Sequence, residues 1–148
     1  MQARELSDTT NAAPIQLSLR IRHPAIDPAE ISEALALEPE HCFKAGDPRG
    51  ATGHHTQSYW LASLSVEPWL SPSESKNFKV WGIEGVLAYF VRRLNTHHSF
   101  LERIQNESGD ISLLLGLERE SVCDFTLPVS LARLLAQSGI SIEFKFDS

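Results

Sequence analysis

Six histidines and two cysteines are the side chains best suited to metal binding or nucleophilic catalysis in this chain. No two histidines have the i, i+4 spacing that places zinc ligands on one helix face, and the chain contains no Cys-x-x-Cys. The sequence therefore predicts no metal site. We interpret the histidines as surface or half-buried residues, at positions His23, His41, His54, His55, His97 and His98.

Catalytic and cofactor motifs are equally sparse. The chain has no Gly-x-Ser-x-Gly elbow, and Cys42 and Cys123 lie beside apolar residues, which is typical of buried thiols. Three glycines recur between residues 46 and 53, but no Gly-Lys-Ser/Thr follows them to form a phosphate loop. The carboxylates around residues 30–40 are interpreted as helix-capping and solvated charges. The sequence predicts no catalytic residue and no cofactor.

One segment is rich in charged side chains and lacks the hydrophobic periodicity that would predict a helix or a strand. The stretch from Lys44 to Gln57 mixes cationic, acidic and histidine residues with glycines, and it leads into Trp60. Loops of this length within compact domains are usually functional or disordered. Its cationic residues and histidines are suited to an anionic group or an acidic partner surface. The candidate binding residues are Lys44, Asp47, Arg49, His54, His55 and Trp60. The alternative is that Gly46-Asp47 forms a turn and that Trp60 belongs to the core.

A second segment, Glu67 to Lys76, is rich in proline and serine and contains Trp69, with Phe78 and Trp81 just after it. Aromatic residues are enriched in interface cores, and loops also use them to attach to their own domain. We favour attachment of the segment to its own domain.

The surrounding elements follow from hydrophobic periodicity. Alternation predicts strands over 15–22, 58–64, 110–119 and 140–146, with 122–127 as the hairpin partner of the third. Asp27-Pro28-Ala29-Glu30 predicts a capped helix that buries Ile31 and Leu35. Apolar residues at spacings of three and four predict a long helical region over 83–104. The polar run Asn95–Ser99, with Ser99 and Glu102 spaced as in a capping box, leaves two alternatives, one continuous helix or two helices. A short helix from Pro128 ends at Gly139.

This β-α-β-α-β-β-α-β order predicts an α+β fold. We expect a two-layer sandwich in which helices cover one face of a mostly antiparallel, ferredoxin-like sheet of about five strands. Residues 1–13 are polar and aperiodic and are expected to form a flexible tail before a single domain at 14–148.

Composition narrows the class of partner. The 148 residues carry a formal net charge of −6 and no basic run, which disfavours nucleic-acid binding. No apolar run is long enough for a membrane helix, and the N-terminus lacks the apolar region of a signal peptide. With only two cysteines, the sequence predicts a cytoplasmic protein.

Several segments, taken in order, resemble a known family. They are the strand Leu17–Ile21, the segment Asp27–Ser32, Leu37-Glu38-Pro39, Lys44-Ala45-Gly46-Asp47, Trp60 and the stretch Leu134–Gly139. Together they are similar to the bacterial domain-of-unknown-function family 4279, over roughly residues 15–146. The resemblance implies a bacterial cytoplasmic α+β domain and no particular activity.

The sequence favours a non-catalytic binding module, for example one resembling an immunity protein that neutralises a partner protein. The alternative is a small-ligand-binding protein or an enzyme with a pocket around Lys44–Trp60. Homodimerisation through an open sheet edge is a third hypothesis.

Overall fold

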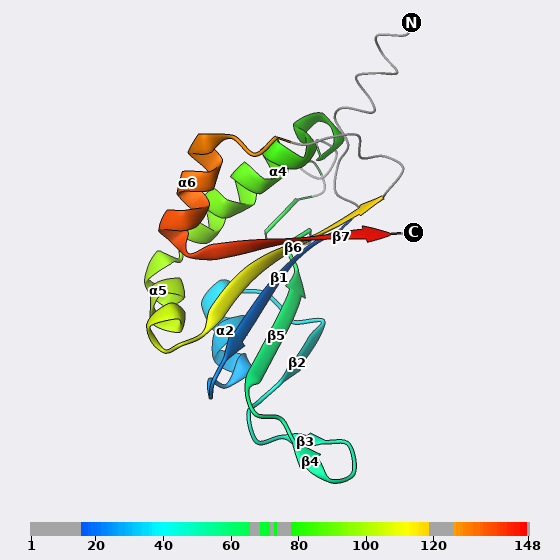
Figure 1. The fold of residues 1–148 in the computed structure, drawn as a ribbon, viewed down its shortest axis with the longest axis vertical. Coiled ribbons are helices and arrows are strands. Elements are labelled where there is room, and N and C mark those ends of the chain that lie inside the picture. The colour runs from blue at the N-terminus through cyan, green and yellow to red at the C-terminus, as the bar shows by residue number, and fades with distance from the viewer. Residues whose placement is uncertain (1–15, 66–68, 72, 74–77, 119–125, 148) are drawn as a thin grey trace, which may run out of the picture.

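The computed structural model describes residues 16–65, 69–71, 73, 78–118 and 126–147 (Figure 1). The expected tail at 1–13, Cys123 and most of the expected strand at 122–127 lie outside these residues. The fold is α+β, with a five-stranded sheet in the order β2-β5-β1-β6-β7 and a separate two-stranded β3-β4 hairpin. The sheet strands are β1 (Gln16–His23), β2 (His41–Phe43), β5 (Ser58–Ser63), β6 (Asp110–Glu118) and β7 (Ile140–Asp147).

The pairing of the strands is mixed. β1 is central and pairs antiparallel with both β5 and β6, β2 pairs antiparallel with β5, and β6 pairs parallel with β7. The mainly antiparallel sheet is as expected, but the ferredoxin-like order is not confirmed. Because β1 and β5 are antiparallel, the helix between them does not make a parallel crossover.

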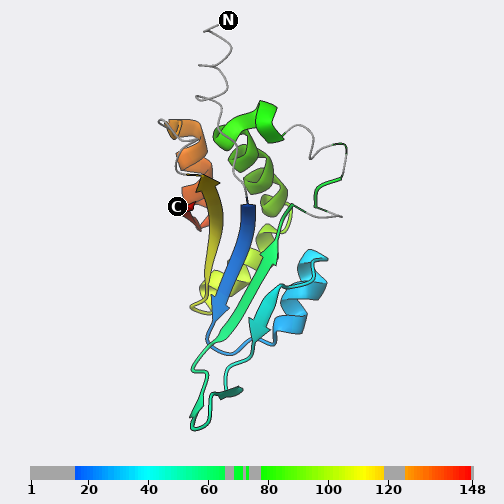
Figure 2. The ribbon, with the colours of Figure 1, turned by 90° about the vertical axis from the view of Figure 1, so that its right-hand side faces the viewer.

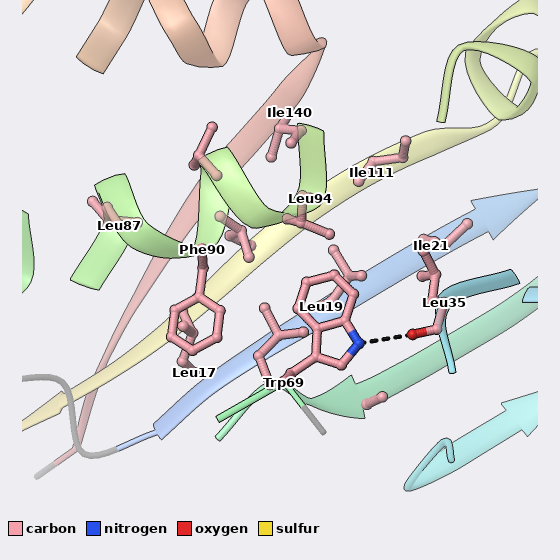
Figure 3. Packing of buried hydrophobic residues seen from close by; sticks show 14 of the residues in the cluster. Leu17, Leu19, Ile21, Leu35, Trp69, Leu87, Phe90, Leu94, Ile111 and Ile140 are labelled. Atoms are coloured by element: carbon pink, nitrogen blue, oxygen red, sulfur yellow. Dashed lines mark hydrogen bonds between the residues drawn. The ribbon is translucent and has the colours of Figure 1, made fainter. Parts of the chain in front are cut away.

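Helices α2 (Pro28–Leu35), α4 (Phe78–Asn95), α5 (His98–Asn106) and α6 (Val129–Ser138) join the sheet in one hydrophobic cluster. The inward residues of the central strand, Leu17, Leu19 and Ile21, are fully buried, and Leu87, Phe90 and Leu94 of α4 pack over them (Figure 3). The other face of the sheet carries residues such as Arg20 and Arg22. It is called the open face below.

Helix α2 begins as its sequence predicts. The Asp27 carboxylate accepts a hydrogen bond from the Ala29 amide at 3.0 Å, and Pro28 occupies the first helical turn. The side chain of Glu30 accepts from Arg103 of α5 at 3.1 Å. Among the described residues, no hydrogen bond from the Asp27 amide to Glu30 completes the predicted capping box. The helix ends at Leu35, followed by Ala36 with a left-handed backbone.

The structure divides the long helical region into two helices, which decides between the two alternatives that the sequence left open. α4 ends at Asn95 and α5 begins at His98, with His97 at the N-cap. Ser99 therefore lies inside α5 and does not cap it. A second break, at Gly82 within α4, was not predicted; its φ of 67° and ψ of −178° are not helical.

Trp69 attaches its segment to the fold, as expected. Its ring is buried, and its indole N–H donates to the Leu35 carbonyl at 2.7 Å (Figure 3). His97 stacks on this ring with centroids 5.5 Å apart, and the Arg93 guanidinium lies 5.3 Å from the ring centroid. The side chains of Phe78 and Trp81 lie outside the described residues.

Candidate functional site

The stretch from Lys44 to Gln57 is an ordered hairpin in the structure. β3 (Pro48–Arg49) pairs antiparallel with β4 (Gly53–His54), and Gly46 and His55 are joined by a backbone hydrogen bond of 2.8 Å. The Asp47 carboxylate accepts the Lys44 amide at 2.8 Å, so Gly46-Asp47 belongs to a turn. The hairpin extends beyond the sheet (Figures 1 and 2). Strands of two or three residues are too short to produce a periodic pattern, so the sequence indicated only irregular structure here.

Trp60 lies in the core, where a ligand bound at the surface could not contact it. It is fully buried on β5, and its indole N–H donates to the Ser32 hydroxyl of α2 at 3.0 Å. The residue therefore fixes α2 against the sheet, as the core interpretation of Trp60 predicted.

Four rings form an aromatic group at the base of the hairpin: His41, Phe43, His55 and Tyr59. Phe43 stacks between His55, at a centroid distance of 3.5 Å, and Tyr59, at 5.3 Å. His41 meets Tyr59 edge-on at 5.6 Å. Phe43, His55 and Tyr59 are half-buried and His41 is exposed, so the group reaches solvent.

Strand register places this aromatic group on the open face. Phe43 lies opposite Tyr59, which in turn lies opposite Arg22 of β1. Directly opposite residues of antiparallel strands point to the same face, so these three side chains share one row. Cys42 lies opposite Trp60 and so belongs to the other face, yet the structure leaves it exposed near the sheet edge. The prediction that Cys42 is buried is therefore wrong. A neighbouring Phe43 indicated burial, but β2 is an edge strand.

A cleft of 730 Å³ separates the first turns of α2 from the segment that leads into the hairpin. Its volume is within the range of small-molecule sites. Lys44 and Asp47 line it together with the exposed Cys42. The other lining residues are Asp27, Pro28, Ala29, Ser32, Glu33, Glu38, Pro39 and Phe43. The lining contains four carboxylates and a single lysine, so the cleft is suited to a cationic group and not to the anionic group that the sequence suggested.

The candidate residues are thus divided among four places, one of which is the core position of Trp60. Lys44 and Asp47 line the cleft, Arg49 and His54 are exposed on the hairpin, and His55 stacks on Phe43. The sequence reasoning did not include His41, Phe43 and Tyr59 among the candidate binding residues. Their alternation with Cys42 and Trp60 is the signal that could have placed them on one face.

His23 has a structural environment. Its Nδ1 accepts the backbone amides of Ala25, at 3.0 Å, and Ile26, at 2.9 Å, and its Nε2 lies 2.7 Å from the Glu107 carboxylate. An imidazole that accepts at Nδ1 carries its proton on Nε2, so it donates to Glu107. The hydrogen bonds of His23 and then of Arg103 lower the pKa of the Glu107 carboxyl. This network connects the end of β1 to α5.

Among the residues that the structure describes, no group of three or more histidine, cysteine, aspartate or glutamate side chains lies close enough to hold a metal ion. None of the helices within the same ranges is long and apolar enough to cross a membrane.

Comparison with known proteins assigns no relative. No family model matches the chain, and no curated protein or solved structure matches it.

Proposed function

We propose that this chain is a non-catalytic interaction module. Its contact surface consists of the exposed hairpin residues Arg49 and His54 and the aromatic group at the hairpin base, and is named the hairpin surface. The observation that carries the proposal is the stack of Phe43 between His55 and Tyr59 on the open face. Aromatic side chains are enriched in interface cores, and rings that already stack lose little freedom when a partner covers them.

The hairpin supplies the second part of this surface. It is held by its own backbone hydrogen bonds and carries a cation, Arg49, away from the sheet. A protein partner with an apolar patch beside acidic side chains fits this combination. A partner-neutralising protein similar to a bacterial immunity protein is one concrete form of the proposal. The resemblance to the domain-of-unknown-function family 4279 does not suggest an activity for this chain, because none is assigned to that family.

The cleft beside α2 supports a second candidate, a binding site for a small cationic ligand. Its support is the 730 Å³ volume and the excess of carboxylates in its lining. Lys44 belongs to the cleft whereas Arg49 belongs to the hairpin, so charge reversal at each residue separates the two candidates.

The test is to place a photo-crosslinking amino acid at position 54 in the hairpin and, as a matched control, at position 133 on α6. His54 and Arg133 are both exposed. We expect one protein from host-cell extract to be captured at position 54 and not at position 133. Arg49→Glu should then weaken the purified complex about tenfold, as charged contact residues often do, whereas Arg133→Glu should leave its affinity unchanged.

Equal capture at both positions would contradict the proposal that the hairpin surface binds the partner. Arg49→Glu and Phe43→Ala variants that bind the captured partner with unchanged affinity would contradict it as well. If only Lys44→Glu abolished binding, the result would indicate that the cleft, and not the hairpin surface, is the binding site. Circular dichroism of each variant separates lost contacts from lost folding.

A further inference from the structure

A hollow of 350 Å³ lies on the open face of the sheet and is named the open-face hollow. One row of residues across the sheet runs from Gln16 of β1 through Gly116 of β6 to Lys145 of β7. In the next row, Ser18 lies opposite Leu114. Gly116 has no side chain, so the first row is open at its centre. A glycine inside a strand often marks a place where a ligand approaches the backbone closely.

The lining of the open-face hollow combines apolar side chains with hydrogen-bond donors. Leu114 is 8% exposed and Leu61 is half-buried, and both line the hollow. Gln16, Ser18 and Lys145 line it as well, and each of these side chains can donate a hydrogen bond. Lys145 also supplies a positive charge, and none of the described lining residues is acidic. The open-face hollow therefore differs from the cleft beside α2 and suits an anion with an apolar body.

Ser18 is a buried polar side chain with unused hydrogen-bonding capacity. It is 4% exposed, and its hydroxyl oxygen accepts from Gln16 Nε2 at 3.5 Å, which is longer than a typical hydrogen bond of this kind. Within the described ranges, its side chain makes no shorter hydrogen bond. Buried hydroxyl groups normally have a good partner. The proton of Ser18 is therefore available to an acceptor bound in the hollow.

The charges around the hollow favour an anion with a single negative charge. Glu143 lies two residues before Lys145, but its carboxylate accepts from Arg20 at 3.0 Å, so that charge is already compensated. Lys145 makes no ion pair in the part of the chain that the structure describes. Glu118 and Asp147 lie opposite each other in the row beyond Lys145, and like charges repel. One lysine beside acidic residues suits a carboxylate better than a doubly charged phosphate.

We propose that the open-face hollow binds a small carboxylic acid. The carboxylate accepts from Lys145, Gln16 and Ser18, and a short apolar body lies on Leu61 and Leu114. The volume is near the lower end of small-molecule sites, so the body is a chain of about six carbons or a single ring. This site is separate from the hairpin surface and does not depend on the proposed function.

The first test titrates isotope-labelled protein with hexanoate and follows the backbone amide signals by NMR. We expect the largest shifts around residues 16–18 of β1, 114–116 of β6 and 145 of β7, with a dissociation constant of about 1 mM for so small a ligand. Acetate has the same charge without the apolar body, and 1-hexanol has the apolar chain without the charge. Both should bind at least about tenfold more weakly, because each lacks one half of the recognition.

Two outcomes of this titration overturn the proposal. One is the absence of shifts around the hollow at saturating hexanoate. The other is equal affinity for 1-hexanol, which would show that the carboxylate is not recognised.

The second test changes the charge at the hollow. Lys145→Gln should weaken hexanoate binding about tenfold and leave the weak binding of 1-hexanol unchanged, because only the charged contact is lost. Ser18→Ala should weaken hexanoate by a smaller factor, since it removes one neutral donor. Arg133→Gln removes the same charge at an exposed position on α6 and should keep the wild-type affinity. Equal affinities for Lys145→Gln and Arg133→Gln would overturn the assignment of the carboxylate to Lys145.

The third test fills the hollow. Gly116→Val places a β-branched side chain at the open centre of the row, which a strand tolerates and a bound ligand does not. We expect loss of binding of both hexanoate and 1-hexanol, with an unchanged circular dichroism spectrum. Wild-type binding by a folded Gly116→Val variant would overturn the location, and if that variant does not fold, the Lys145→Gln result alone decides.

Discussion

At the scale of single residues, several side chains with reactive chemistry hold the fold together. His23 satisfies two backbone amides and donates to Glu107, and His97 stacks on the buried Trp69. The spacing of the histidines along the sequence predicted no metal site. It could not predict the contacts of His23 with Glu107 or of His97 with Trp69, because these residues are far apart in the sequence. Cys42 was predicted to be buried but is exposed, because apolar neighbours along the chain do not guarantee burial on an edge strand.

His97 gives the stability of the protein a pH dependence. Its pKa is lowered from 6.5, first by burial and then by the positive charge of Arg93. Below pH 6.5 the unfolded chain therefore binds a proton that the folded His97 resists. The free energy of unfolding should be largest above pH 6.5 and should fall as the pH drops through that value.

Urea denaturation on either side of that pH checks this expectation. His97→Gln should reduce the loss of stability on acidification, because the variant has no group to protonate there. His98→Gln, at an exposed neighbouring histidine, should retain the wild-type loss. Equal pH dependence in the His97→Gln variant and the wild type would show that His97 is not responsible.

At the scale of elements, local chemistry explains where most helices begin and end. Asp27 and Pro28 start α2, and Gly139, with φ of +67°, ends α6. The end of α6 also receives a contact that no local pattern shows. The side-chain amide of Gln105, on α5, donates to the carbonyls of Ser138 at 2.8 Å and Gly139 at 3.1 Å.

Alanine substitutions at two glycines with similar positive φ should distinguish the free-energy cost of backbone strain from the cost of a lost side-chain contact. Gly50 has φ of +64° and open space where a Cβ would stand, whereas a Cβ at Gly139 would lie 2.4 Å from the Gln105 amide nitrogen. Gly50→Ala should destabilise by about 1–2 kcal/mol through left-handed backbone strain alone. Gly139→Ala should cost about 1 kcal/mol more, because displacement of Gln105 also breaks its hydrogen bonds.

Thermal or urea unfolding of both variants measures these costs. The comparison is internal, since each variant adds one methyl group to a left-handed glycine. Equal destabilisation would show that Gln105 moves aside without loss, and that its bonds to the end of α6 contribute nothing to stability.

At the scale of the whole molecule, the helices and the inward side of the sheet share one core. The open face carries polar side chains such as Arg20 and Arg22 beside the buried Ser18 and Ser112. The hairpin surface lies at the side of the sheet formed by β2 and β5, with β1 between it and the strands β6 and β7.

The one-sided core predicts unequal costs for two leucines that lie on neighbouring strands. Leu19, on the core side of β1, is fully buried, and Leu61, on the open face of β5, is half-buried. Leu19→Ala should destabilise by about 2–5 kcal/mol, as for a fully buried leucine, and Leu61→Ala by less than half of that. Denaturant unfolding of both variants measures the difference. A larger loss for Leu61→Ala would mean that the open face is covered.

The sequence by itself determined the elements whose signals are local. Alternation located β1, β5, β6 and β7, the caps located α2 and the end of α6, and periodicity located the helical region of α4 and α5. These signals depend on side chains that are neighbours along the chain or around one helical turn. Only the tertiary structure decided the mixed strand order, the short β2 and the hairpin. It also decided the division of the candidate residues among cleft, hairpin, aromatic group and core. Each of these depends on which segments meet across the sheet, and a pattern confined to one segment carries no information about its partner.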